Sequence, residues 1–207
     1  AENTAVGGGA LGANTTASNN TAVGQQALLS NTTGTNNIAI GVQALEQNTT
    51  GEANIAIGKQ ALDANTTASN NTAIGQAALT ANTTATGGTA LGAQSLEANT
   101  TGNYNTAVGM QSLESNQTGT DNVAIGYYAM QANLASNNVA VGRRALAANT
   151  TGTQNTAVGN NALDANTTAS YNVAIGADAL TANTTGANHI AIGVLALAAN
   201  TTGSDNL

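Results

Sequence analysis

Residues 37–58 read NIAIGVQALEQNTTGEANIAIG, so the segment Asn37–Gly41 returns unchanged as Asn54–Gly58. The spacing of 17 residues holds along the chain, because glycine stands at positions 7, 24, 41, 58, 75, 92, 109, 126, 142, 159, 176 and 193, with one step of 16 residues. Strict self-similarity at a short period is typical of a stacked, quasi-one-dimensional fold. We therefore interpret residues 1–207 as a single array of twelve 17-residue repeats, one of them shortened (126–141), without separate domains.

The composition does not allow a conventional core of large side chains. Charged residues make up 6% of the chain and aromatic residues 2%, and there is no Pro, Cys, Trp or Phe. Such a chain must be held by many small, repeated contacts and by backbone hydrogen bonds. Its low net charge and its regularly placed Ile, Val and Leu argue against a disordered chain.

Several classes of function are disfavoured by the same numbers. The net charge is −7 and there are only three Lys and Arg residues, which argues against nucleic-acid binding. The apolar runs are a few residues long, so a transmembrane helix is not expected. No signal peptide is recognised at the start of the sequence.

One repeat, counted with Asn3 as position 1, follows the consensus N-[TIV]-A-[IV]-G-x-x-A-L-x-x-N-T-T-[GA]-x-x. The β-branched residues at positions 2 and 4 favour a strand, and the glycine at position 5 suits a bend or a close backbone approach. The Ala-Leu pair at positions 8 and 9 is predicted to lie in a second short extended segment. Positions 12–15 are predicted to form a turn in which Asn and Gly adopt left-handed conformations.

This pattern predicts an all-β fold. No stretch between turns reaches about ten residues, and Asn, Thr and Gly are poor helix formers. We therefore predict a parallel β-solenoid with one coil per repeat. Coils spaced about 4.8 Å apart would give a rod roughly 58 Å long.

The strand pattern also predicts self-association. In a strand, positions 2 and 4 face one way and position 3 faces the other, yet all three are small or apolar in nearly every copy, as in Ile38-Ala39-Ile40. Strands that are apolar on both sides are usually buried on both sides, and we interpret positions 8 and 9 in the same way. One face is expected to line the coil interior, and the other to pack against a second copy. A parallel homotrimer is the simplest closed form, and an end-to-end filament is the alternative.

The segments Asn155–Gly159 (NTAVG) and Ile38–Gly41 (IAIG) resemble the head repeats of trimeric autotransporter adhesins, which carry an S-V-A-I-G-x-x-A core on a shorter period. The resemblance covers the whole chain, but the extra residues here fall in the N-T-T turn. It implies a left-handed parallel β-roll, three of which pack around a common axis. Similar repeats occur in phage-type and other surface fibres. The implied function is a non-enzymatic, extracellular, structural or adhesive fibre at the cell surface, with no particular ligand.

The Asn column at position 12 allows two interpretations. Eleven copies satisfy N-x-T, the acceptor pattern for N-glycosylation. The alternative, which we favour, is a structural ladder in which stacked side-chain amides are hydrogen-bonded from coil to coil. The column comprises Asn14, Asn31, Asn48, Asn65, Asn82, Asn99, Asn116, Asn133, Asn149, Asn166, Asn183 and Asn200.

The Thr columns at positions 13 and 14 suggest a second function, because regular Thr arrays on solenoids are typical of ice-binding proteins. In a fully extended segment, however, adjacent threonines such as Thr32 and Thr33 would point to opposite sides. A monomeric ice-binding solenoid is therefore the alternative to the fibre.

Position 10 forms an interrupted acidic column of Glu46, Asp63, Glu97, Glu114 and Asp164. Calcium requires six to eight oxygen ligands, and no aspartate-rich loop accompanies these residues. We interpret the column as a solvated acidic edge that discourages aggregation.

The candidate interaction patch lies beside the shortened repeat. Tyr127 and Tyr128 occupy positions 6 and 7 of one coil, and Arg143 and Arg144 occupy the same positions of the next. Arg stacked on Tyr would contribute about 0.5–1 kcal/mol when exposed, and both residue types are favoured at recognition hot spots. The alternative is a local staple beside a shortened coil.

No catalytic, cofactor or metal site is expected from the remaining residues. His189 replaces a position-1 Asn, and a single His without a Cys or second His is a poor metal site. The glycines do not belong to a strand–loop–helix unit that could hold a phosphate.

Overall fold

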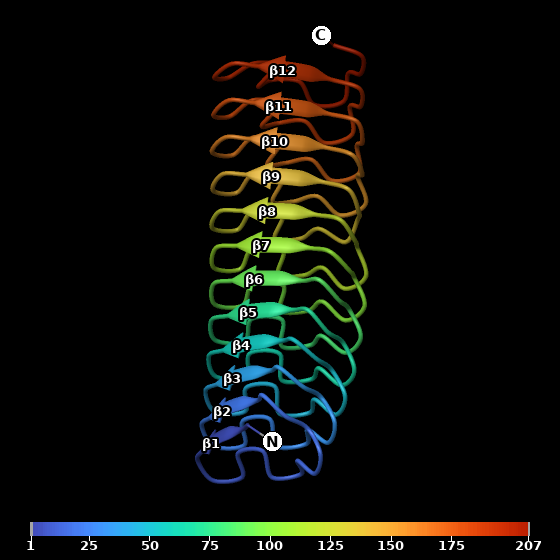
Figure 1. Cartoon of the computed structure of the whole chain (residues 1–207). Coiled ribbons are helices and arrows are strands. Elements are labelled where there is room, and N and C mark those ends of the chain that lie inside the picture. The colour runs from blue at the N-terminus through green and yellow to red at the C-terminus, as the bar shows by residue number, and fades with distance from the viewer. Residues whose placement is uncertain (1, 207) are drawn as a thin grey trace.

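The computed structural model describes residues 2–206 as a parallel β-solenoid in which coils stack from one terminus to the other (Figure 1). Each coil contributes one three-residue strand, and the strands pair in sequence order in a single twelve-stranded sheet. The predicted fold class is thereby confirmed. The strands are β1 (Thr4–Val6), β2 (Thr21–Val23), β3 (Ile38–Ile40), β4 (Ile55–Ile57), β5 (Thr72–Ile74), β6 (Thr89–Leu91), β7 (Thr106–Val108), β8 (Val123–Ile125), β9 (Val139–Val141), β10 (Thr156–Val158), β11 (Val173–Ile175) and β12 (Ile190–Ile192).

Identical positions of the repeat lie side by side in the sheet. Ile38 pairs with Ile55 and Ala39 with Ala56, and the same register relates every neighbouring pair of strands. The shortened repeat does not interrupt this register, because Ala124 of β8 still pairs with Ala140 of β9. The missing residue is therefore absorbed in the turn between Asn133 and Asn138.

The apolar core of the coil is formed by three residues per repeat. These are Ala at position 3, Ala or Ser at position 8, and Leu or Met at position 9, and from the second to the eleventh coil all are fully buried. One large and two small side chains per coil leave no room for an aromatic residue. Each buried leucine contributes about 1.5–3 kcal/mol relative to an exposed one.

The prediction of a second extended segment at positions 8 and 9 is wrong. Positions 6–11 form a succession of tight turns, closed by bonds such as the Ala27 amide to the Gly24 carbonyl. The residue at position 9 adopts a left-handed conformation, with φ of 50° at Leu28. Both Ala and Leu therefore point into the coil instead of to opposite faces. The left-handed conformation costs a non-glycine residue about 1–2 kcal/mol, which is offset by burial of the leucine and by its amide bond to the next coil.

The positions near the N-T-T turn that adopt a left-handed conformation are not the ones that the sequence predicts. They lie at position 17, for example Asn36 with φ of 60°, whereas Asn31 and Gly34 at positions 12 and 15 have no positive φ. The Asn at position 12 is held by its side-chain hydrogen bonds, which leaves position 17 to reverse the chain. The glycine at position 5 does make the close approach that was expected. Its φ lies between 126° and 139° in every coil, and from Gly7 to Gly176 it lies next to the glycine carbonyl of the following coil.

Candidate interaction surfaces

The outer surface of the sheet is a continuous, uncharged face. Positions 2 and 4 of β1–β12 point outwards, as in Ile38 and Ile40, which are 37% and 39% exposed on either side of the fully buried Ala39. These two positions hold only Thr, Val, Ile and Leu, although the chain carries a net charge of −7. We call these outward side chains the strand face.

The size of the strand face follows from strand geometry. Three residues at 3.3 Å each by twelve strands at about 4.8 Å give a surface of about 600 Å². Two such faces in contact would bury about 1,200 Å², which is the lower end of the range for stable protein–protein interfaces.

The Asn side chains at position 12 are hydrogen-bonded from coil to coil. The Asn65 Nδ2 donates to Oδ1 of Asn48 at 2.8 Å and to the Ala68 carbonyl at 3.1 Å. From Asn31 to Asn183 these side chains are at most 1% exposed. A glycan has no room on such a side chain in the folded coil, so the geometry favours the structural ladder over glycosylation.

The Asn at position 1 of the consensus forms a second column of hydrogen-bonded side chains, a role that was not predicted from the sequence. The Asn37 Oδ1 accepts the backbone N–H of Asn54 at 3.0 Å, and its Nδ2 donates to the Gly51 carbonyl at 2.8 Å. The Asn48 Nδ2 donates to the same carbonyl at 3.0 Å, so the two columns converge inside each coil. The signal was present, because Asn fills position 1 in ten of the twelve repeats.

His189 takes the place of an Asn in this second column. It is fully buried, and its backbone N–H donates to Oδ1 of Asn172 at 3.0 Å. Its Nδ1 accepts the backbone N–H of Asn206 at 3.2 Å. The imidazole therefore continues the column, in the same role as the amide that it replaces.

The position-12 ladder is broken at the shortened repeat. The Asn133 Nδ2 donates to the Ala135 carbonyl at 2.8 Å and not to Asn116. The Oδ1 of Asn116 is consequently buried without a hydrogen-bond partner. Beyond the break the ladder resumes, with Asn149 donating to Asn133 at 2.6 Å.

Only one of the two Thr columns faces solvent. At position 13 the hydroxyl is used within the solenoid, as when Thr49 Oγ1 donates to the Thr66 carbonyl at 3.0 Å. At position 14 every Thr is exposed, and among residues 2–206 none of these hydroxyls makes a hydrogen bond to the chain. The column comprises Thr16, Thr33, Thr50, Thr67, Thr84, Thr101, Thr118, Thr151, Thr168, Thr185 and Thr202.

The acidic edge is partly satisfied by neighbouring amides. Gln43 donates to Glu46 at 2.9 Å, and the same arrangement recurs at Glu97 and Glu114. Asp63 differs, because its pKa is raised above its ordinary value, first by burial and second by the charge of Glu46. Its Oδ1 is buried without a partner. In the described part of the chain no three acidic, His or Cys side chains lie close enough to share a metal ion.

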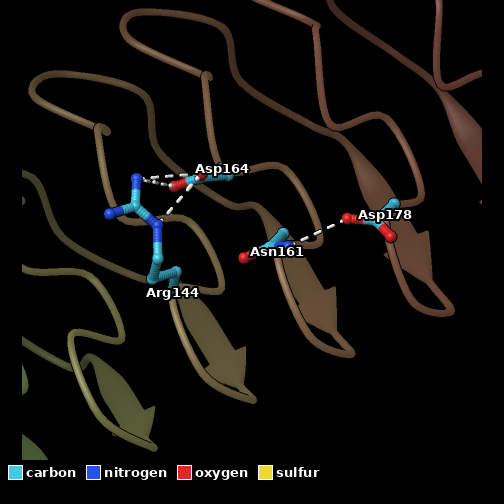
Figure 2. Close-up of polar contacts among 4 residues, drawn as sticks. All are labelled: Arg144, Asn161, Asp164 and Asp178. Carbon is cyan, nitrogen blue, oxygen red and sulfur yellow. Dashed lines mark hydrogen bonds and ion pairs between the residues drawn. The ribbon is translucent and has the colours of Figure 1, made fainter.

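The four residues of the candidate patch do not form the predicted Arg-on-Tyr stack. The Tyr127 and Tyr128 rings pair with each other, with centroids 4.0 Å apart and planes at 51°. The pKa of Tyr128 is raised, mainly by hydrogen bonding with the Tyr127 side chain. Arg144 instead reaches Asp164 of the next coil, where its Nη2 lies 3.0 Å from Oδ2 (Figure 2).

The Arg144–Asp164 contact belongs to a short polar row along the turns that follow the strands. The Arg144 Nε also donates to Asp164 at 3.3 Å, and Asn161 donates to Asp178 at 3.0 Å in the same row (Figure 2). The Arg144 side chain is 44% exposed, and exposed ion pairs contribute about 0–1 kcal/mol. This pair is therefore a modest link between coils, while Arg143 remains exposed.

Comparison of the chain with protein-family models, with curated proteins and with solved structures finds no match. Residues 2–206 contain no helix that is long and apolar enough to cross a membrane. No enclosed pocket is found among them.

Proposed function

We propose that the chain is a non-enzymatic structural or adhesive fibre segment whose copies associate through the strand face. The observation that carries the proposal is the strand face itself, a row of twelve strands that presents aliphatic and Thr side chains without a single charge. Burial of apolar surface is worth roughly 25 cal/mol per Å². Covering this face would therefore stabilise the chain beyond its own coil stacking.

The proposed arrangement is a parallel homotrimer at the cell surface. The resemblance to the head repeats of trimeric autotransporter adhesins supports both the number of chains and the extracellular location. Repeats in one copy are matched to those of another by the common coil spacing, so parallel copies place equivalent strands opposite one another. Electron microscopy of the native material, with labelling of intact cells by an antibody to the chain, tests the assembly and its location.

Sedimentation of the purified chain at micromolar concentration tests the self-association. Lysine at two positions of the strand face, Ile40→Lys and Ile57→Lys, should convert the oligomer to a monomer, because each copy would bring two charges into the interface. Gln47→Lys and Gln117→Lys add the same charge at exposed positions away from the strand face and serve as the matched control. A wild-type chain that sediments as a stable, folded monomer contradicts the proposal.

Ice binding is the second candidate, and the position-14 Thr column favours it. These hydroxyls are exposed, unbonded within the described chain and present in eleven of the twelve repeats, about 4.8 Å apart in neighbouring coils. Thr67→Tyr with Thr84→Tyr should abolish ice shaping, whereas Gln47→Lys should preserve it. Absence of both thermal hysteresis and crystal faceting with the wild-type chain eliminates this candidate.

A further inference from the structure

A periodic strand face attracts a second copy without fixing how far the two copies are offset along the fibre. A slip by one coil still places eleven of the twelve strands opposite an equivalent strand, so it removes only about one twelfth of the contact. Strands with weakly distinguished side chains are known to pair in alternate registers. The shortened repeat does not solve this problem, because the sheet continues through it without a change of register.

The repeat symmetry is broken along one edge of the strand face. Position 6 follows the glycine after each strand, in the turns beyond the arrowheads of Figure 1. The other repeats carry Gly, Ala, Val, Gln, Asn or Lys there, whereas three consecutive coils carry Met110, Tyr127 and Arg143. All three are exposed, with Met110 at 46% and Tyr127 at 39%.

These three residue types are the ones that interfaces favour. Aromatic residues, Met and Arg are enriched at protein–protein interfaces, whereas Lys and Ala are depleted. Arg143 is also available for such a contact, because the ion pair of the described residues is made by Arg144. On the opposite edge, Tyr104 lies against Gly87 of its own chain, where an added Cβ would come within 2.8 Å of the ring.

We propose that Met110, Tyr127 and Arg143 form a register key that aligns two copies of this chain along the fibre axis. The partner is a second copy, and the inference rests on the proposed self-association through the strand face. In the aligned register the three side chains of each copy meet the equivalent coils of the other. A slip by one coil moves these three side chains away from the equivalent coils of the other copy, while the strand face stays almost fully covered.

Cysteine cross-linking measures the register directly, because the chain contains no native Cys. Thr106→Cys and Thr89→Cys place single thiols at position 2 of neighbouring strands. One chain carries a mass tag, so that each cross-linked pair is resolved by gel electrophoresis after mild oxidation. Mixed chains that both carry Thr106→Cys report the aligned register, and mixtures of Thr106→Cys with Thr89→Cys report a slip by one coil.

We expect cross-linking of the aligned pair to exceed that of the slipped pair by about tenfold, which corresponds to about 1.4 kcal/mol. In the background Met110→Gln, Tyr127→Gln and Arg143→Gln, the two yields should become equal while the oligomer persists. The fold should tolerate these changes, because Gln already occupies position 6 at Gln25 and Gln76. The matched control, Gln25→Ala with Gln76→Ala and Asn160→Ala, should retain the tenfold preference.

The possible outcomes separate this inference from the function on which it rests. Equal yields in the wild-type chain, or an unchanged preference in the triple Gln background, would overturn the register key and leave self-association standing. A monomer that forms no cross-link in any combination would overturn the proposed self-association, and the register key with it.

Discussion

Replacing Gly75 by alanine tests the physical basis of the coil stacking. Gly75 has a φ of +137°, which side chains with a Cβ rarely adopt. A Cβ at this position would lie 2.6 Å from both the carbonyl carbon and the oxygen of Gly92, and 2.9 Å from the amide nitrogen of Ala93. All three atoms belong to the backbone of the next coil, so no side-chain rotation can relieve the contact.

The expected cost combines two effects. A residue held in a sparsely populated region of φ/ψ space costs about 1–3 kcal/mol, and forcing additional atoms into a packed site costs a further 1–3 kcal/mol or so. We therefore expect Gly75→Ala to lower the free energy of unfolding by at least about 2 kcal/mol, the sum of the two lower limits.

Urea unfolding followed by far-ultraviolet circular dichroism measures this loss, and hydrogen exchange locates it. Exchange should rise first in the coils around Gly75, because each repeat contacts only its neighbours. Gly8→Ala is the matched control, since Gly8 has no positive φ and a Cβ there would meet nothing within 4 Å. If Gly75→Ala unfolds within about 0.5 kcal/mol of the wild-type chain, as ordinary surface substitutions do, the argument from close glycine stacking is refuted.

Three further changes probe the polar columns. Asn82→Ala should cost about 1–3 kcal/mol in urea unfolding, because it leaves the buried Oδ1 of Asn65 without a donor. Asn14→Ala at the partly exposed end of the ladder should cost less, and equal losses would contradict this reasoning. Asp63→Asn should stabilise the chain at pH 7 by about 0.2–1 kcal/mol, because it removes first the penalty of a partly buried charge and second the repulsion with Glu46. The pKa of Asp63 is raised in the folded state, so the charged carboxylate destabilises the wild-type fold fully above that pKa, less as the pH falls through it, and not at all below the ordinary value of 3.8. The stability advantage of Asp63→Asn should therefore vanish in acid. A constant advantage across this pH range would argue against this reasoning. Insertion of one threonine after Leu134, combined with Leu134→Thr, should restore the ladder and raise the free energy of unfolding by about 1–3 kcal/mol. An unchanged midpoint in urea would show that the unpaired Oδ1 of Asn116 does not destabilise the fold.

The candidate surfaces were partly visible in the sequence. The invariant Asn at position 12 and the uncharged positions 2 and 4 could be recognised, because in a stacked fold any repeated residue lies above its own copy. The Asn at position 1 was equally regular, but its bonds run to position 15 across the coil and could not be inferred from spacing alone. The partners of Arg144 and Tyr127 also escaped prediction, since they depend on which way the turn at positions 6–11 points each side chain.

The sequence by itself determined the period, the parallel register and the number of coils. A chain that repeats every 17 residues and cannot form helices buries its leucines most readily by stacking each coil on an identical one. Only the tertiary structure decided the path within a coil. Leucines such as Leu28 adopt a left-handed backbone that their own propensity disfavours, because the neighbouring coil offers both a carbonyl for the amide and a buried site for the side chain. The orphaned Asn116 amide follows from the same dependence, since its missing partner lies on a neighbouring coil that is one residue short.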